Sequence, residues 1–261
     1  MRSVERLSAA ERVALLVPLA GGLAFGLGPL LLPQTLAGLS GYSGDDPLIA
    51  RLAGAATLGY AVALALGINE GRARPLRFVL LATLVFNVGS LFACSVEIVS
   101  GGARPIVYLI LVADVVIIAI AAALLRGHAE PPAARDVGSW VVTLLAILTV
   151  PATIFGLFPL LAPQSFATLF GYHGTDAFVF RQAGAATLGY AAMGVAEIRS
   201  GRWHGIRLPV VMALVFNSAA FLATAYHMAA LGEVNLLTIA VAPASLFATI
   251  ATALILTLRG H

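Results

Sequence analysis

The sequence predicts an all-α membrane protein, because of its composition, the length of its apolar segments and an internal repeat. Of its 261 residues, 60% are hydrophobic and only 10% are charged, whereas ordinary soluble domains carry about a quarter charged residues. A soluble fold could not cover so much apolar surface, so lipid must solvate much of the chain. The apolar runs are long and do not alternate in polarity, which favours helices over membrane β-strands.

Eight segments are long enough to cross a bilayer. A membrane-spanning helix needs about 20 mostly apolar residues. We expect the eight spans at Val13–Leu32, Leu48–Ile68, Leu76–Val99, Pro105–Leu125, Trp140–Leu161, Phe178–Ile198, Leu208–Ala230 and Leu236–Leu258. An even number of spans places both termini on one side of the membrane.

The arginines predict the orientation. Twelve lie on the side of the two termini, and only Arg51, Arg104 and Arg181 lie on the other side. Positive residues accumulate in short cytoplasmic loops. We therefore expect a multi-pass protein of a bacterial inner (cytoplasmic) membrane with both termini in the cytoplasm. The twelve are Arg2, Arg6, Arg12, Arg72, Arg74, Arg77, Arg126, Arg135, Arg199, Arg202, Arg207 and Arg259.

The second half of the chain repeats the first at a shift of 130 residues. The stretch "RLAGAATLGYAV" at Arg51 returns as "RQAGAATLGYAA" at Arg181, and "FGLGPLLLPQTLAGLSGY" at Phe25 returns as "FGLFPLLAPQSFATLFGY" at Phe155. We interpret this as a tandem duplication, with a first four-helix repeat over residues 1–127, a cytoplasmic linker over 128–139 and a second repeat over 140–261. Two repeats of four helices insert in parallel and are related by a pseudo-twofold axis along the membrane normal. We expect two four-helix bundles side by side.

The repeated phrase carries small residues on one helix face. Ala55, Gly59 and Ala63 follow at intervals of four, as do Ala185 and Gly189. Small residues allow helix backbones to approach closely in lipid, so a helix contact is the first interpretation and a close approach to a ligand is the alternative.

Polar residues at membrane depth are the candidates for a ligand pathway, because burying them in lipid is costly. Asn87 and Asn217 occupy matching places in the third helix of each half, and Thr57 and Thr187 in the second. We expect these four residues to line the pseudo-symmetric centre. Hydrogen bonds between helices are the structural alternative.

Asp114 lies near the expected bilayer midplane, in "LILVADVVIIAI". It could relay protons, hold a cation, or form a hydrogen-bonded protonated acid. Its counterpart in the second half is Ala244. Glu97 and its counterpart His227 fall near outer helix ends, where interfacial solvation would account for them.

Charged residues at the outer ends form a second group of candidates. Arg51 and Arg181 each begin a helix, and Asp46 and Asp176 precede them by five residues. The arginines could pair with these acids, contact lipid headgroups, or capture an anionic ligand.

Several classes of function are disfavoured by what the sequence does not contain. It carries no HExxH, P-loop, GxSxG or CxxC motif, and Cys94 is its single cysteine. Its histidines lie on separate segments and none is deep in an expected span, which disfavours haem or another metal. We therefore expect no cofactor, no metal and no catalytic residue. The arginines form no stripe, so nucleic acid is not an expected partner.

Each half resembles the small DoxX-like membrane proteins of bacteria, in the stretch "LLPQTLAGLSGY" that leads to "RLAGAATLGY". The resemblance implies a four-helix bundle unit, and some members of that group have ties to quinone and redox physiology. The present chain departs from the single-unit pattern because two units are fused. No functional residue is carried over.

The leading functional hypothesis is binding or transport of a small apolar or weakly polar molecule between the two repeats, with Asp114, Asn87 and Asn217 along its path. A second hypothesis is a non-catalytic structural subunit that binds another membrane protein. A third is a membrane enzyme acting on a lipid or quinone, whose headgroup would contact Arg51, Arg181, Asp46 and Asp176. The bilayer itself is a partner in all three.

Overall fold

A computed structural model describes residues 6–128, 134–172 and 176–259, and in these ranges the chain is almost entirely helical. The helices are α1 (Ala9–Leu31), α2 (Pro33–Ser40), α3 (Pro47–Glu70), α4 (Ala73–Val99), α5 (Pro105–Gly127), α6 (Ser139–Leu161), α7 (Pro163–Leu169), α8 (Ala177–Ser200), α9 (Trp203–Ala230) and α10 (Leu236–Arg259).

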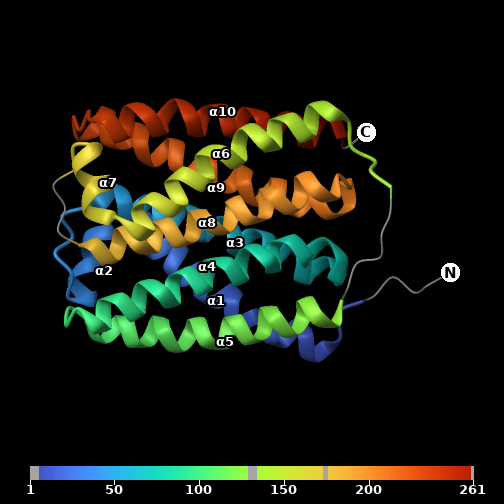
Figure 1. Ribbon diagram of the computed structural model, residues 1–261, viewed down its shortest axis with the longest axis horizontal. Helices are drawn as coiled ribbons and strands as arrows, with labels where there is room; N and C mark the ends of the chain where they lie inside the picture. The colour runs from blue at the N-terminus through green and yellow to red at the C-terminus, as the bar shows by residue number, and fades with distance from the viewer. Residues whose placement is uncertain (1–5, 129–133, 173–175, 260–261) are drawn as a thin grey trace.

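The eight long helices run along the length of the molecule, and the short helices α2 and α7 lie at one end of it (Figure 1). Seven of the long helices, all except α8, are long and apolar enough to cross a membrane. Each has at least 23 residues, and at about 1.5 Å per residue such a helix exceeds the roughly 30 Å hydrocarbon core. The structure therefore confirms the prediction of an all-α, multi-pass membrane protein.

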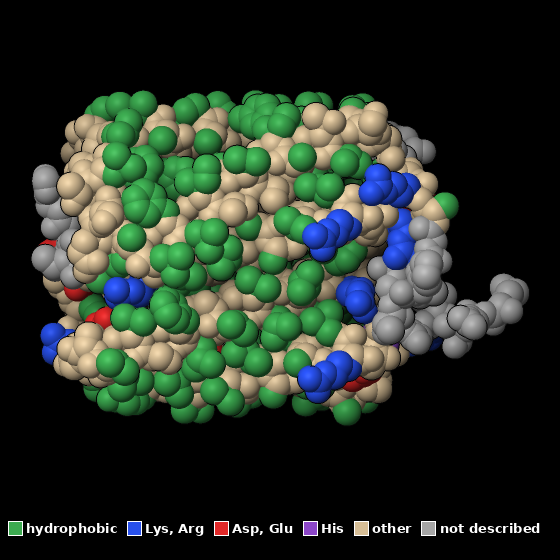
Figure 2. Space-filling view, in the orientation of Figure 1, with side chains coloured by type: hydrophobic (Ala, Val, Ile, Leu, Met, Phe, Trp, Pro, Cys, Tyr) green, Lys and Arg blue, Asp and Glu red, His purple; other side chains and the backbone are tan. Residues whose placement is uncertain are grey.

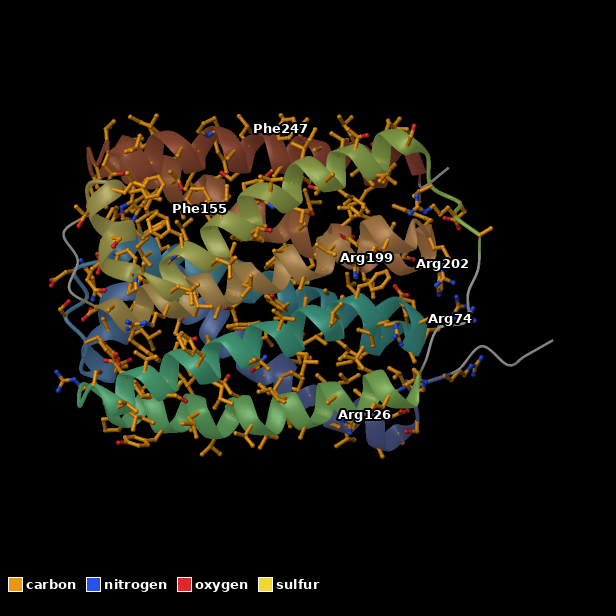
Figure 3. The ribbon with its side chains drawn as sticks, viewed as in Figure 1. Arg74, Arg126, Phe155, Arg199, Arg202 and Phe247 are labelled. Atoms are coloured by element: carbon orange, nitrogen blue, oxygen red, sulfur yellow. The ribbon has the colours of Figure 1, made fainter. Side chains whose placement is uncertain are left out.

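The surface carries apolar side chains along its length and charges near its ends (Figure 2). Arg74, Arg126, Arg199 and Arg202 all lie towards the end that also holds the connection between the halves (Figure 3). The opposite end carries α2, α7 and the loops that follow them. An apolar middle between polar ends is the surface expected of a protein solvated by lipid.

Local sequence signals set the helix ends. Ser8 and Glu11 form a capping box at the start of α1, which satisfies backbone N–H groups that have no partner within the helix. Pro33 opens α2 directly after α1 ends, because proline lacks a backbone N–H and cannot continue the hydrogen-bond ladder of α1. Gly71 and Gly201 end α3 and α8 in the left-handed conformation, with φ of 64° and 59°, which glycine adopts without steric cost.

Corresponding helices of the two halves have corresponding bounds. Adding 130 to Ala9–Leu31 of α1 gives Ser139–Leu161 of α6, and adding 130 to Pro47–Glu70 of α3 gives Ala177–Ser200 of α8. These two pairs of helices therefore have the same bounds at a shift of 130 residues.

The two halves interleave, so the expectation of two separate bundles side by side was wrong. Helix α3 packs between α1 of its own half and α9 of the other, and α8 packs between α6 and α4. Contacts between α3 and α4, or between α8 and α9, are few although these helices are consecutive in the chain. The reason is that α3 and α8 both occupy the centre, where each offers its small-residue face to the opposite half.

Two glycines allow these close contacts between helices of the two halves. A Cβ on Gly59 of α3 would collide with the Tyr190 hydroxyl and would lie 2.7 Å from the Met212 carbonyl oxygen of α9. A Cβ on Gly189 of α8 would collide with the Tyr60 hydroxyl and approach the backbone of α4 in the same way. The repeated phrase is therefore a helix contact surface, as predicted from its spacing.

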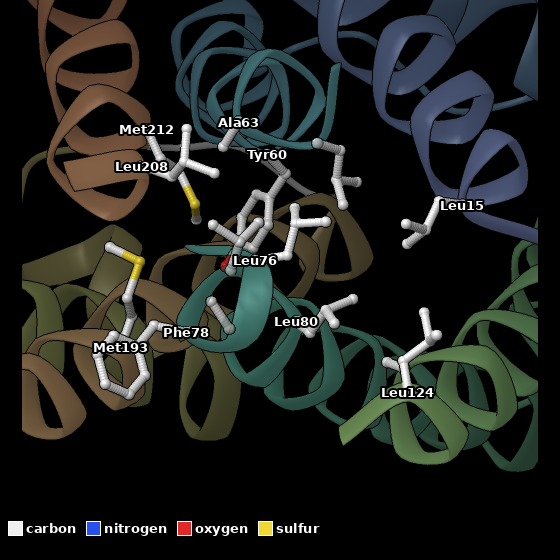
Figure 4. Close-up of a cluster of buried hydrophobic side chains, with 14 of the residues drawn as sticks. Leu15, Tyr60, Ala63, Leu76, Phe78, Leu80, Leu124, Met193, Leu208 and Met212 are labelled. Carbon is white, nitrogen blue, oxygen red and sulfur yellow. The ribbon is translucent and has the colours of Figure 1, made fainter. Parts of the chain in front are cut away.

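Tyrosine hydroxyls join the central helices reciprocally. Tyr60 donates a hydrogen bond of 2.8 Å to the Ala186 carbonyl, and Tyr190 donates one of 2.7 Å to the Ala56 carbonyl. The two rings lie edge to face at 5.1 Å, a favourable arrangement for aromatic pairs. In Figure 4, Tyr60 lies close to the buried side chains Leu76 and Met212, which belong to α4 and α9.

Helix α8 is less apolar than its neighbours because it faces protein more than lipid. Only Val195 and Arg199 of its 24 residues are exposed, and small residues fill most of its length. A helix enclosed by other helices needs few large lipid-facing side chains. The packing of α8 inside the bundle therefore accounts for its lower apolar content.

The close approach at Gly59 predicts a strong effect of one methyl group. Gly59→Ala should destabilise the protein by about 1–3 kcal/mol through overpacking. The melting temperature of the detergent-solubilised protein should then fall by at least about 3 °C. Gly38→Ala is the matched control, because nothing lies within 4 Å of the Cβ it would add on α2. Equal melting temperatures for the two variants would contradict this packing.

Candidate functional site

Two cavities lie inside the bundle, one mainly in each half. The first pocket, of about 190 Å³, lies among α1, α3, α4 and α5 and is completed by Phe178, Val179 and Gln182 of α8. The second pocket, of about 220 Å³, lies among α6, α8, α9 and α10 and is completed by Ile49 and Leu52 of α3. Each half therefore contributes residues to the pocket of the other, as the interleaved packing requires.

The expected single pathway along the pseudo-symmetric centre is replaced by these two pockets. Asn87 and Thr57 line the first pocket, and Asn217 and Thr187 line the second. The centre between them is filled by the Tyr60–Tyr190 pair, which leaves the two asparagines on opposite sides of a packed core. The structure therefore does not bring the four candidates together.

The amides and hydroxyls of these four residues bond within their own helices. Asn87 donates to the Thr83 carbonyl at 2.7 Å and Asn217 to the Ala213 carbonyl at 2.8 Å. Thr57 and Thr187 each donate to a carbonyl four residues earlier at 2.8 Å. The expected alternative, hydrogen bonds between helices, is not what these donors form. The side-chain carbonyls of the asparagines can still accept a hydrogen bond from a ligand.

Asp114 of α5 lies on the wall of the first pocket and is 4% exposed. The Cys94 thiol of α4 lies 4.0 Å from its Oδ2, and the Gln182 amide of α8 lies 3.8 Å from the Cys94 sulfur. Ser90 of α4 lies beside the same carboxyl. Two polar groups of α4 thus lie beside Asp114, and Gln182 of α8 reaches this group through the Cys94 sulfur. The matching wall of the second pocket has Ala244 in place of Asp114.

Glu197 of α8 is a pocket residue that the sequence analysis did not single out. It lines the second pocket, is 2% exposed, and its Oε1 is buried without a hydrogen-bond partner. Its counterpart in the first half is Gly67, where the Leu76 side chain takes up the space. The sequence carried one signal of this residue, because an acid stands here where the otherwise similar first half has a glycine.

His227 was also misjudged from sequence, because it is fully buried rather than solvated at an interface. Its Nε2 lies 2.5 Å from Nη1 of Arg51, and its Nδ1 lies 2.6 Å from Glu233. A histidine protonated at Nδ1 satisfies both contacts, since Arg51 then donates to Nε2. Arg51 also lies over the Tyr226 ring, 5.1 Å from its centroid. Arg51 therefore joins α3 to α9 and is not paired with Asp46.

The two aspartates before α3 and α8 have different surroundings. Asp176 accepts hydrogen bonds from the Ser43 hydroxyl at 2.7 Å and from the Gly44 backbone at 3.2 Å, which ties the two outer loops together. Asp46 is 2% exposed and neither carboxylate oxygen has a hydrogen-bond partner. Burial and the charge of Asp176 raise the pKa of Asp46 to about 6. Arg181 lies half-buried at the same end.

Arg51 and Asp176 therefore serve contacts between helices and between loops. Within the residues that the structure describes, no group of three or more histidine, cysteine, aspartate or glutamate side chains is placed to hold a metal ion. The pockets are consequently the regions best suited to a ligand, because small-molecule sites are concave, mostly apolar and carry a few polar groups.

Comparison with known proteins adds no constraint: no family model, no curated protein and no solved structure matches this chain. The functional argument therefore rests on the chain's own residues.

Proposed function

We propose that the chain crosses a bacterial inner membrane eight times, with α8 as the eighth span and both termini in the cytoplasm. Helix α8 is as long as its counterpart α3 and lies in the centre of the bundle, parallel to spans that are more apolar. The start of α1, the end of α5, the start of α6 and the end of α10 lie at one end of the molecule (Figure 1). The sequence assigns twelve of the fifteen arginines to the side of the termini, and the positive-inside bias places that side in the cytoplasm.

Contacts that recur at a shift of 130 residues support two parallel four-helix repeats with a pseudo-twofold axis along the membrane normal. Helix bounds, the tyrosine hydrogen bonds and the glycine approaches all recur at a shift of 130 residues. The likeness to DoxX-like proteins stays an expectation about the unit of this repeat.

Cysteine accessibility tests whether α8 crosses the membrane. In a Cys94→Ala background, Thr168→Cys and Arg199→Cys lie at opposite ends of α7–α8, and both positions are exposed. In intact cells, a membrane-impermeant maleimide should label Thr168→Cys directly and Arg199→Cys only after permeabilisation. Gly38→Cys and Asn69→Cys are the matched controls, because they lie at the corresponding ends of α2–α3. Labelling of Thr168→Cys and Arg199→Cys from the same side would contradict an eighth span.

We further propose that each pocket binds a small apolar or weakly polar molecule that enters from the lipid. The observation that carries this proposal is the pair of mostly apolar cavities at equivalent positions, each with a few polar groups. Phe247 of α10 lines the second pocket and is also 46% exposed, so that pocket reaches the lipid-facing surface. Figure 3 labels Phe247 on α10 and Phe155 on α6, and both residues line this pocket.

Binding in two pockets is compatible with transport, if each pocket opens towards both sides in turn. The second pocket extends along α8 from Phe180 near the outer end to Glu197 near the inner end. Glu197 follows Phe180 by 17 positions, which corresponds to about 25 Å of helix, or most of the hydrocarbon thickness. A structural subunit and an enzyme acting on a lipid or quinone stay alternative hypotheses from the sequence.

Photolabelling tests ligand binding in the second pocket. A diazirine-bearing octanol, applied to the protein in lipid nanodiscs, should label residues of the pocket wall. Ala248 of α10 lines the pocket and is 5% exposed, so Ala248→Phe should fill the space and reduce pocket labelling at least fivefold. Ile250→Phe is the control, because Ile250 on the same helix is 51% exposed. Labelling confined to lipid-facing residues, and equal in both variants, would contradict the proposal.

A further inference from the structure

The carboxyl of Glu197 is buried at the inner end of the second pocket without a complete set of partners. It lies in the last turns of α8, is 2% exposed, and its Oε1 has no hydrogen-bond donor. A buried carboxyl without a donor is costly in a low-dielectric surrounding. Such a group persists where something other than the folded chain satisfies it, or where it serves a ligand.

The neighbouring side chains do not supply the missing donor. The Thr149 and Thr252 hydroxyls, which line the same end of the pocket, donate to the carbonyls of Leu145 and Ala248 at 2.7 Å. Arg135 approaches the end of α8 but directs its guanidinium to the carbonyls that follow Glu197 in the chain, at 3.5 Å. Glu197 therefore stands on the pocket wall with a carboxyl whose hydrogen-bonding capacity the folded chain does not satisfy.

The rest of the pocket is a long apolar channel. Along α8 its wall follows one helix face, through Phe180, Ala183, Thr187, Tyr190 and Gly194 to Glu197. The facing walls are aromatic and aliphatic, and include side chains from α6, α9 and α10. A mostly apolar pocket with a carboxyl at one end of its α8 wall is complementary to a molecule with an alkyl chain and a hydrogen-bond-donating, positively charged head.

The first pocket lacks this feature. Gly67 stands in place of Glu197, and the Leu76 side chain fills the position that a longer residue would need. Its own carboxyl, Asp114, lies halfway along the helix and already has the Cys94 thiol and the Ser90 hydroxyl beside it. The two pockets therefore differ in where a polar group of a ligand would be held.

We propose that the second pocket binds lipophilic primary amines, with the ammonium group donating to Glu197 and the alkyl chain along α8. An ammonium group provides three donors and a charge opposite to that of the carboxylate, so its bond is stronger than that of a neutral hydroxyl. An alcohol of the same length retains the apolar contacts but loses the charge. This inference rests on the proposed ligand-binding function and names the class of ligand for one of its two pockets.

The test compares two photoreactive probes of equal length, a diazirine-bearing octylamine and the corresponding octanol, on the full chain in nanodiscs of zwitterionic lipid. In the wild type, the amine should label the second pocket at a concentration at least tenfold lower than the alcohol. Glu197→Gln should abolish this preference while leaving labelling by the alcohol unchanged. Asp114→Asn, in the first pocket, is the control and should keep the preference.

Each alternative outcome has a distinct meaning. Equal labelling of the wild-type pocket by amine and alcohol, or an amine preference that Glu197→Gln retains, would overturn the assignment to Glu197 and leave pocket binding intact. Absence of pocket labelling by both probes would overturn pocket binding itself, and the assignment with it. Equal labelling of the wild type by the two probes overturns the assignment without any variant, so the proposal stays falsifiable even if Glu197→Gln does not fold.

Discussion

The close contact of α3 with α9 and of α8 with α4 is the constraint on which the rest of the structure depends. It exists because Gly59 and Gly189 present no side chain where the tyrosine of the opposite half and a backbone carbonyl arrive. In lipid, helix association relies on packing and hydrogen bonds rather than on exclusion of water. The reciprocal hydroxyl bonds of Tyr60 and Tyr190 add polar contacts that are satisfied on both sides.

This contact determines where empty space can remain. Helices α3 and α8 meet in the centre, and the Tyr60 and Tyr190 rings fill the space between them. The cavities therefore lie to either side, each between a central helix and the peripheral helices of its half. Because the two halves interleave, each pocket takes part of its wall from the other half. The two pockets can therefore differ, as Glu197 differs from Gly67 at the corresponding position, while both rest on the same packed centre.

The sequence predicted the helices well because apolar length is a local property, although it began α4 at Leu76 and α9 at Leu208, after their arginine-containing first turns. The small-residue face was also predictable, since its spacing is that of a helix contact. The partners of that face were not, because a repeat predicts symmetry without saying which half packs against which. Glu197 and His227 looked like ordinary helix-end residues, and their burial follows only from the packing of neighbouring helices.

The most direct test of this account is native mass spectrometry of gently solubilised protein, with an optical spectrum of the same sample. If the two pockets hold small molecules, the wild type should carry one or two discrete added masses, each smaller than a phospholipid. Ala248→Phe should remove the one that belongs to the second pocket. A chain that carries only phospholipid or detergent, or that is found solely with a second polypeptide, would contradict ligand binding as the central function.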